Sequence, residues 1–218
     1  MIKAVIFDMD GLMFDTEFLV VKGWDYAGEK LGYGKLGYMI YKAIGTNSQK
    51  TKEIFYEEFG DKVDVDKLTE CTREFVYKYY EENGVPEKPY LHETIEFLHK
   101  SGYKLAVASS SRRQTVESHI KGAGLIDYFN AIVCGDMITK SKPDPEIYLK
   151  AAQELNVKPE ECIALEDSPN GIKSAYNANM QVIMIPDLVK PTEEIKKLIT
   201  AELKDLGQFI SFVKEKYN

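Results

Sequence analysis

The sequence has few cysteines, no clustered positive charge and no long hydrophobic run. Its three cysteines among 218 residues are an odd number, lie far apart and form no C-x-x-C pair. This spacing indicates free thiols in a reducing compartment rather than disulfides or a zinc site. We therefore interpret Cys71, Cys134 and Cys162 as small hydrophobic residues and exclude them from the chemistry.

The charge balance and the lack of apolar runs exclude two classes of partner. There are 28 Lys and Arg residues against 35 Asp and Glu, so the formal net charge is -7. Nucleic-acid backbones select clustered Lys and Arg, and the only adjacent basic pairs are Arg112-Arg113 and Lys196-Lys197. No apolar run approaches the roughly 20 residues that span a bilayer, and no signal-peptide core precedes Asp8. We expect a cytoplasmic protein without nucleic-acid or membrane partners.

Hydrophobic residues make up 44% of the chain and gather in short apolar runs that predict buried strands. The five predicted strands are Lys3–Phe7, Lys104–Ala108, Ala131–Cys134, Cys162–Leu165 and Gln181–Ile185. Helical patterns separate them at 92–101, 114–122 and 145–155, the last with Asp144 as N-cap and Pro145 at the first helical position. This alternation is typical of a doubly wound, Rossmann-like α/β fold with a mostly parallel sheet. Continuously apolar strands predict that helices cover both faces.

One long segment, 16–83, shows no convincing strand pattern and predicts several helices. It contains Trp24 and eight of the 14 tyrosines, which is typical of a small separate hydrophobic core. We therefore expect an α/β core at 1–15 and 84–218 with a helical domain inserted at 16–83. The insert follows the first strand, and ligands of open α/β sheets bind beyond the carboxyl ends of strands. A helical domain there would cover such a site.

Polar side chains follow four of the predicted strands, at the point where each strand ends. Their positions are Asp8 and Asp10 after the first strand, Ser109 after the second, Lys142 after the third, and Glu166 and Asp167 after the fourth. Because the carboxyl ends of parallel strands meet at one edge of the sheet, these groups should converge. Each motif alone has an ordinary structural explanation. These are a solvated Asp-rich turn, a Ser-rich turn, an exposed Lys before a helix and a helix-capping acidic turn, but four such coincidences at one edge are improbable.

Such a set favours phosphoryl transfer. Four carboxylates cannot be ionised side by side without a cation or shared protons, and oxygen ligands with room for water describe a Mg²⁺ site. A Ser hydroxyl and a Lys ammonium match the oxygens of a transferring phosphoryl group. One carboxylate could attack phosphorus, and a second could protonate the leaving oxygen.

Taken together, D-x-D-G at 8–11, Ser109, K-P-D-P at 142–145 and E-D-S at 166–168 resemble the four motifs of the haloacid dehalogenase superfamily. The resemblance covers nearly the whole chain and is strongest to the phosphatase and β-phosphoglucomutase branch, which carries a C1-type helical cap. It implies that Asp8 is the nucleophile and Asp10 the general acid and base. It also implies Mg²⁺ ligation by the Asp8 carboxylate, the Asp10 carbonyl and Asp167, with Glu166 supporting or ligating. Ser109 and Lys142 would bind the phosphoryl oxygens.

Departures from relatives narrow the expected reaction. Dehalogenases of the superfamily lack the second Asp of D-x-D, so Asp10 favours phosphoryl transfer. β-Phosphoglucomutases carry a His shortly after that motif and an Arg in the cap loop, whereas 15–20 contains no His and 45–49 no Arg. We expect a phosphatase acting on a small phosphate monoester such as a sugar phosphate or a nucleotide. The alternatives are a phosphosugar mutase and a binding protein that has kept the fold but lost catalytic activity.

Specificity is expected to come from the helical cap and from the loop beyond the second strand. The candidates are Thr46, Asn47, Ser48 and Arg112. His92, His99 and His119 have no Ser or Cys partner at a catalytic spacing, so we interpret them as structural or surface residues. We expect a monomer, because the cap can close the site without a second subunit.

Overall fold

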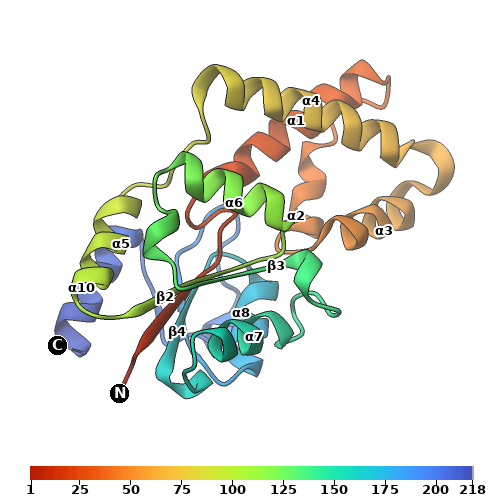
Figure 1. Cartoon of the computed structure of the whole chain (residues 1–218). Helices are drawn as coiled ribbons and strands as arrows, with labels where there is room; N and C mark the ends of the chain where they lie inside the picture. The colour runs from red at the N-terminus through yellow and green to blue at the C-terminus, as the bar shows by residue number, and fades with distance from the viewer. Residues whose placement is uncertain (218) are drawn as a thin grey trace.

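Short buried strands form a parallel sheet in this computed structural model, which describes residues 1–217 (Figure 1). The six strands run in the order β3-β2-β1-β4-β5-β6, and every neighbouring pair is parallel. Their bounds are Ala4–Phe7 (β1), Lys104–Ser109 (β2), Ala131–Cys134 (β3), Cys162–Glu166 (β4), Gln181–Met184 (β5) and Ala201–Glu202 (β6). The predicted doubly wound α/β class is confirmed.

The five predicted strands are all present, and their ends differ from the prediction by at most one residue. The sixth strand, β6, escaped the sequence analysis because it has two residues, of which Glu202 is exposed. The third predicted helix begins one residue late: Pro145 is the N-cap, and helix α7 starts at Glu146. Asp144 was therefore wrongly expected as the N-cap, although its side chain accepts a hydrogen bond from the Glu146 amide at 3.0 Å.

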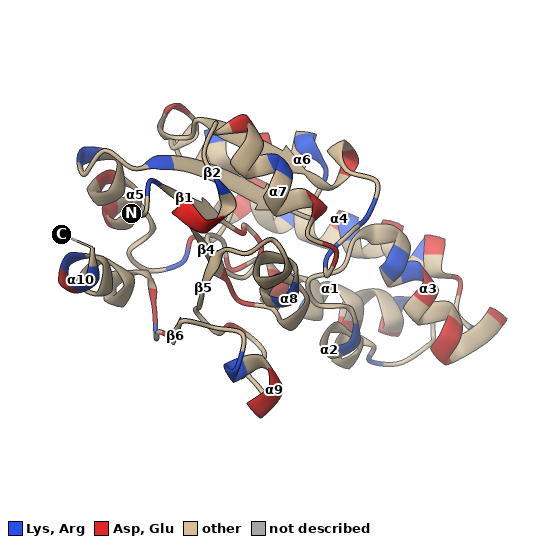
Figure 2. Ribbon diagram, turned by 90° about the horizontal axis from the view of Figure 1, so that it is seen from below, with Lys and Arg blue, Asp and Glu red and all other residues tan. Residues whose placement is uncertain are grey.

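Helices cover both faces of the sheet, which explains the continuously apolar strands. Val5 and Phe7 of β1 face one hydrophobic cluster, and Ala4 and Ile6 face the other. Helices α5 (Leu91–Lys100), α6 (Arg113–Gly122) and α10 (Leu206–Lys216) pack on the first face, and α7 (Glu146–Glu154), α8 (Pro169–Asn177) and α9 (Glu193–Lys196) on the second. Figure 2 shows α5 and α10 on one side and α7 and α8 on the other. Burying each large apolar side chain contributes about 1.5–3 kcal/mol.

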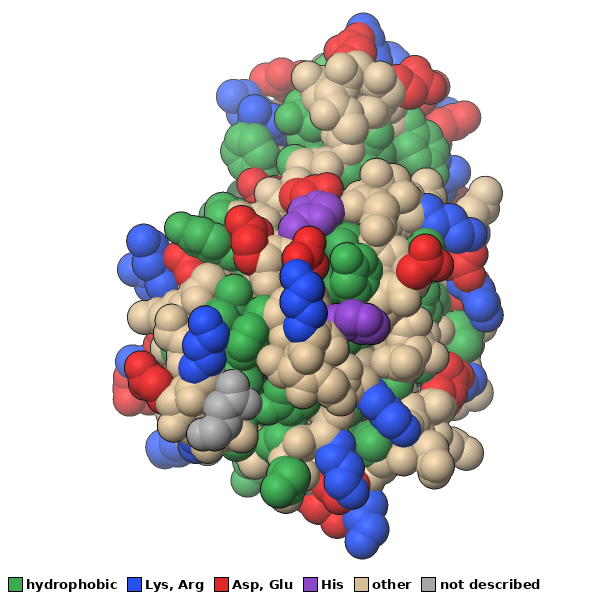
Figure 3. Space-filling view, turned by 60° about the vertical axis from the view of Figure 1, so that its left-hand side comes forward, with side chains coloured by type: hydrophobic (Ala, Val, Ile, Leu, Met, Phe, Trp, Pro, Cys, Tyr) green, Lys and Arg blue, Asp and Glu red, His purple; other side chains and the backbone are tan. Residues whose placement is uncertain are grey.

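Residues 16–83 fold into helices without a strand and pack around their own aromatic core. The helices are α1 (Thr16–Lys30), α2 (Ile40–Ala43), α3 (Ser48–Phe59) and α4 (Val65–Asn83). Trp24 and Phe55 meet edge-on with ring centroids 5.0 Å apart, inside a cluster that α1, α3 and α4 share. This helical segment lies beyond the carboxyl ends of the strands and stands out as a lobe in the space-filling view (Figures 1 and 3).

Short 3₁₀ helices complete the chain at η1 (Gly37–Met39), η2 (Gly60–Lys62), η3 (Ile126–Tyr128), η4 (Gly135–Met137) and η5 (Pro159–Glu161). No helix within residues 1–217 has the length and apolar character needed to cross a membrane.

Two chain segments join the helical segment to the sheet, and they pair with each other. Phe14 and Glu87 form an antiparallel bridge. The Lys88 ammonium lies 3.0 Å from Asp15 Oδ1 and 2.6 Å from Asp187 Oδ1, so it links both segments to the loop after β5. The connection is therefore fixed by backbone pairing and by one shared cation.

Candidate active site

The carboxyl edge of the sheet brings together a buried lysine and two carboxylates. Lys142, in the loop before α7, donates to Asp8 Oδ1 at 2.5 Å and to Glu166 Oε1 at 2.6 Å. Its third hydrogen bond, at 3.1 Å, goes to the carbonyl oxygen of Ala108 near the end of β2. The Lys142 side chain is only 1% exposed. Asp8 follows β1 and Glu166 ends β4, and these strands are neighbours in the sheet.

Burial controls the protonation of this cluster. It raises the pKa of Asp8 to about 8, although the Lys142 ammonium pulls it down. Burial also raises the pKa of Asp167 well above its ordinary value, and the neighbouring Asp8 and Glu166 carboxylates add to the rise. For Lys142, burial lowers the pKa, but the attraction of Asp8 and Glu166 outweighs it and the pKa rises. Three buried carboxylates thus face one ammonium, and the cluster is short of positive charge.

Three carboxylates of this cluster could hold a small, hard cation. Asp8, Glu166 and Asp167 each offer an oxygen, and the three oxygens lie within 4.8 Å of one another. Asp167 Oδ2 is buried and has no hydrogen-bond partner in the described chain. Gly11 lets the backbone approach this oxygen closely: its φ is +82°, and a Cβ at this position would lie 2.4 Å from Asp167 Oδ2. An all-oxygen set of this kind suits Mg²⁺.

The Asp10 carboxylate is hydrogen-bonded by hydroxyl groups rather than by Lys142. Its Oδ1 accepts a hydrogen bond from Thr16 Oγ1 at 2.8 Å, and its Oδ2 accepts one from Ser111 Oγ at 2.7 Å. The buried Ser109 Oγ lies 3.4 Å from the same Oδ2 and accepts from the Ser111 amide at 3.1 Å. Because Thr16 opens α1, Asp10 lies where the sheet edge meets the helical segment.

Several residues of the site were missed by the sequence analysis. Tyr148 of α7 donates to Glu166 Oε1 at 2.6 Å, and its ring centroid lies 5.1 Å from Lys142 Nζ. Gly171 of α8 approaches the same carboxylate so closely that a Cβ would lie 1.8 Å from Glu166 Oε1. Glu17 of α1 lies nearby, and burial, with Asp10 and Asp8 adding to it, raises its pKa to about 8. The E-D-S-P-N-G segment gave a sequence signal for Gly171 and the D-T-E segment at 15–17 gave one for Glu17, whereas nothing in the sequence indicated Tyr148.

A cavity of about 370 Å³ opens between this edge of the sheet and the helical segment, and Asp8, Asp10 and Asp167 are among its lining residues. Of the predicted specificity residues, Thr46 and Ser48 line it. Asn47 lies outside the lining and caps α3, its Oδ1 accepting from the Lys50 amide at 2.9 Å. Arg112 also lies outside the lining and precedes α6. Their roles in specificity stay predictions.

Comparison with known proteins identifies the family. The family model described as haloacid dehalogenase-like hydrolase matches residues 5–185. The chain belongs to the haloacid dehalogenase-like hydrolases. It is 36% identical to YhcW of Bacillus subtilis, named as a candidate phosphatase, over 88% of this chain and 87% of that protein. It is also 31% identical to the phosphorylated carbohydrates phosphatase of Thermotoga maritima, over 83% of each.

Solved structures agree with this assignment. CbbY from Rhodobacter sphaeroides, determined in complex with phosphate, superposes with a TM-score of 0.80 at 26% identity and covers 96% of both chains. The β-phosphoglucomutase of Clostridium difficile shares the fold with a TM-score of 0.81 at 24% identity, covering 100% of this chain and 98% of that one. The expected superfamily and its phosphatase and β-phosphoglucomutase branch are confirmed. This haloacid dehalogenase-like hydrolase is a phosphatase that acts on phosphorylated compounds.

Proposed function

We propose that this hydrolase is a Mg²⁺-dependent phosphatase that cleaves a small phosphate monoester through an aspartyl-phosphate at Asp8. The observation that carries the proposal is the buried cluster in which Lys142 contacts Asp8 while Asp167 Oδ2 is left without a partner. Lys142 neutralises one carboxylate and can face a phosphoryl oxygen. The unpartnered Asp167 Oδ2 supports a cation bound next to Asp8. Asp8, Asp167 and the Asp10 carbonyl would hold Mg²⁺, with Glu166 supporting or ligating.

In the first half of the reaction, an Asp8 oxygen attacks phosphorus and the bond from phosphorus to the leaving oxygen breaks. Ser109 and Lys142 hold the phosphoryl oxygens, and Asp10 gives its proton to the leaving alcohol. In the second half, Asp10 takes a proton from water, and the water oxygen attacks phosphorus. Asp8 is released as a carboxylate together with inorganic phosphate. Bound Mg²⁺ supplies positive charge that offsets the anionic nucleophile and phosphoryl group.

We further propose that 16–83 acts as a cap domain over an α/β core formed by 1–15 and 84–218. The independent aromatic core of the helical segment and its position beyond the strand ends support this division. The substrate would be a sugar phosphate or a nucleotide enclosed between cap and core. Because both parts come from one chain, the enzyme would act as a monomer. The three free cysteines support a cytoplasmic location, and the acidic net charge supports the absence of a nucleic-acid partner.

The test is release of inorganic phosphate with and without Mg²⁺ from a panel of sugar phosphates, nucleotides and an aryl phosphate. Release should require Mg²⁺, disappear on chelation and be abolished in Asp8→Asn. Asp10→Asn should slow it by about 10²–10⁴-fold, the usual contribution of a general acid and base. Asp127→Asn, the same change at an exposed residue of η3, is the matched control and should keep full activity.

Similarity to a solved structure named as a candidate β-phosphoglucomutase, at 27% identity, makes a phosphosugar mutase the second candidate function. A mutase would isomerise hexose phosphates without stoichiometric phosphate release and would be activated by a bisphosphate. The same panel distinguishes the two reactions. Full phosphate release by Asp8→Asn would contradict both, since each of them needs the nucleophile.

A further inference from the structure

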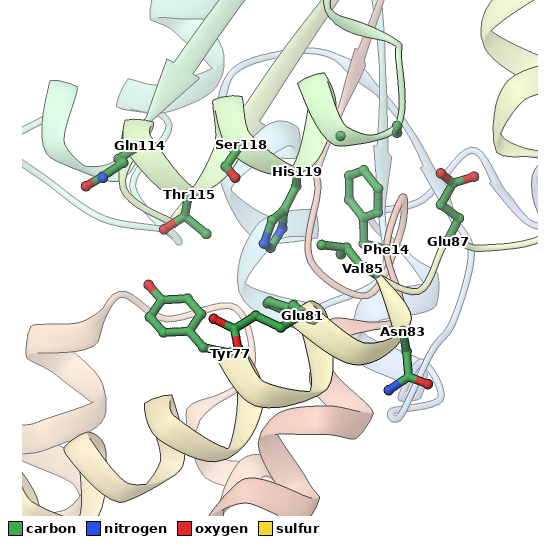
Figure 4. Close-up of a pocket in the computed structure, with 14 residues that line it drawn as sticks. Phe14, Tyr77, Glu81, Asn83, Val85, Glu87, Gln114, Thr115, Ser118 and His119 are labelled. Atoms are coloured by element: carbon green, nitrogen blue, oxygen red, sulfur yellow. The ribbon is translucent and has the colours of Figure 1, made fainter.

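A second cavity of about 710 Å³ adjoins the active-site cavity. It lies between α4 of the helical segment and α6, a helix that packs on the sheet (Figure 4). Tyr77 and Tyr80 of α4 and Thr115 and His119 of α6 line both cavities. The two cavities therefore adjoin at these four residues. The proposed mechanism assigns no role to this groove, which we call the α4–α6 groove.

The polar groups of the α4–α6 groove favour an uncharged occupant. Among its described lining residues there is no Lys or Arg, whereas Glu81 and Glu87 contribute carboxylates. The Glu87 carboxylate is already paired with His92 at 2.8 Å. Asn83 and Gln114 contribute amides that can both donate and accept hydrogen bonds. An anionic group such as a second phosphate would be repelled here, and an uncharged hydrogen-bonding group would be accepted.

His119 has a ring nitrogen without a hydrogen-bond partner at the boundary between the two cavities. The residue is 5% exposed, and its Nδ1 is buried without a hydrogen-bond partner in the described chain. Its ring lies edge-on between Phe14 and Tyr80, with centroids 5.6 and 5.2 Å away. Figure 4 shows His119 pointing from α6 toward Glu81 of α4. Burial lowers the pKa of His119 although Asp10 opposes this, and a neutral imidazole has one nitrogen that accepts a hydrogen bond and one that donates.

The walls of the groove add flat apolar surface to these polar groups. Phe14, Tyr77 and Tyr80 contribute aromatic rings, and the Tyr77 side chain is half exposed. Aromatic walls with a few hydrogen-bonding groups are typical of sites for ring-bearing small molecules. The 370 Å³ cavity contains Asp8 and the groove lies beyond His119, so we expect a longer leaving group to reach the groove.

We propose that the α4–α6 groove binds the leaving group of the substrate, and that this group is uncharged, carries rings and hydrogen-bond donors, and is longer than one sugar. The inference rests on the proposed function and narrows its substrate class. A nucleoside and a disaccharide share this chemistry. In either case a donor on the leaving group reaches His119 Nδ1 while the phosphate lies at Asp8.

Four phosphate esters test this substrate class with the intact wild-type enzyme. Glycerol 2-phosphate is compact, adenosine 5′-monophosphate and trehalose 6-phosphate are extended and uncharged beyond the phosphate, and adenosine 3′,5′-bisphosphate adds a second anion. We expect kcat/KM for at least one extended monophosphate to be tenfold or more higher than kcat/KM for glycerol 2-phosphate. We also expect kcat/KM for the bisphosphate to be lower than kcat/KM for adenosine 5′-monophosphate. Which extended ester is preferred identifies the leaving group. A preference for the compact ester or for the bisphosphate would overturn the inference.

His119→Phe tests the acceptor directly, because it keeps a ring between Phe14 and Tyr80 and removes Nδ1. We compare kcat/KM for the preferred extended ester with kcat/KM for glycerol 2-phosphate. We expect the ratio of the two to fall about tenfold, mainly because KM for the extended ester rises. This corresponds to about 1.4 kcal/mol, within the range for one hydrogen bond. His99→Phe is the matched control, because His99 also meets an aromatic ring edge-on, Tyr128 at 5.2 Å, but lies outside both linings. It should keep the ratio.

Glu81→Lys provides a second test at an exposed position that tolerates substitution. A cation in the groove should raise the ratio of kcat/KM for the bisphosphate to that for adenosine 5′-monophosphate several-fold. Unchanged ratios in both variants would overturn the groove assignment while leaving the proposed function intact, provided that glycerol 2-phosphate still releases phosphate. Failure of all four esters to release phosphate would instead contradict the proposed function itself.

Discussion

Lys142 shows, at the scale of single residues, what the sequence reveals about the site and what it does not. The position of Lys142 after the third strand predicts that it lies at the sheet edge with Asp8 and Glu166, because parallel strands end together. The contact from Tyr148 was not predictable, since it depends on how α7 packs against the sheet. Residues at strand ends can thus be found from the sequence, whereas their supporting partners on helices cannot.

Replacing Tyr148 tests the stability of this buried network. Tyr148→Phe keeps the ring and removes the hydroxyl that donates to Glu166 Oε1 at 2.6 Å. We expect a loss of about 1.5–3 kcal/mol in the free energy of unfolding, the usual contribution of a hydrogen bond to a charged group. Denaturant unfolding measures it. Tyr176→Phe, on the exposed surface of α8, should change stability by less than about 0.5 kcal/mol. Equal losses in the two variants would refute the role assigned to the Tyr148 hydroxyl.

Secondary-structure elements follow the sequence closely where burial is continuous. β1, β2, β4 and β5 are recognisable because neighbouring strands and helices on both faces bury nearly every residue. The paired segments around Phe14 and Glu87 gave no such signal, since their bridge joins positions far apart in the chain. The backbone amide of Asp15 donates to the Pro86 carbonyl at 2.8 Å, a contact that depends on the completed fold. These segments set where the helical segment stands relative to the sheet.

The Lys88 ammonium is the testable part of this connection. Lys88→Met should lower the free energy of unfolding by about 1–3 kcal/mol, because it leaves the Asp187 side chain, only 10% exposed, without its cation. The double variant Lys88→Met/Asp187→Asn should lose less than the sum of the single variants, since the stranded charge is gone. Denaturant unfolding measures all three proteins. Lys190→Met, at an exposed lysine nearby in the chain, should be neutral. A similarly small effect of Lys88→Met would show that backbone pairing alone fixes the connection.

At the scale of the whole molecule, two hydrophobic layers enclose the sheet and a third cluster lies inside the helical segment. The sequence predicted the α/β class and the helical insert from periodicity and composition. The sequence could not predict the 370 and 710 Å³ cavities between the helical segment and the sheet. The size of these cavities depends on how α4 lies against α6. We therefore expect substrate choice to depend on how these helices are arranged rather than on any single motif.

Trapping the phosphoenzyme tests the covalent role of Asp8 most directly. Enzyme turning over a phosphate ester in the presence of Mg²⁺ is quenched, its acyl phosphate is reduced with borohydride, and the peptide containing Asp8 is analysed by mass spectrometry. A sample without substrate and the Asp8→Asn variant serve as controls. We predict homoserine at position 8 in the wild-type enzyme only when substrate is present. Mg²⁺-dependent phosphate release with Asp8 unmodified, or with another residue modified in its place, would contradict the assignment of Asp8 as the nucleophile.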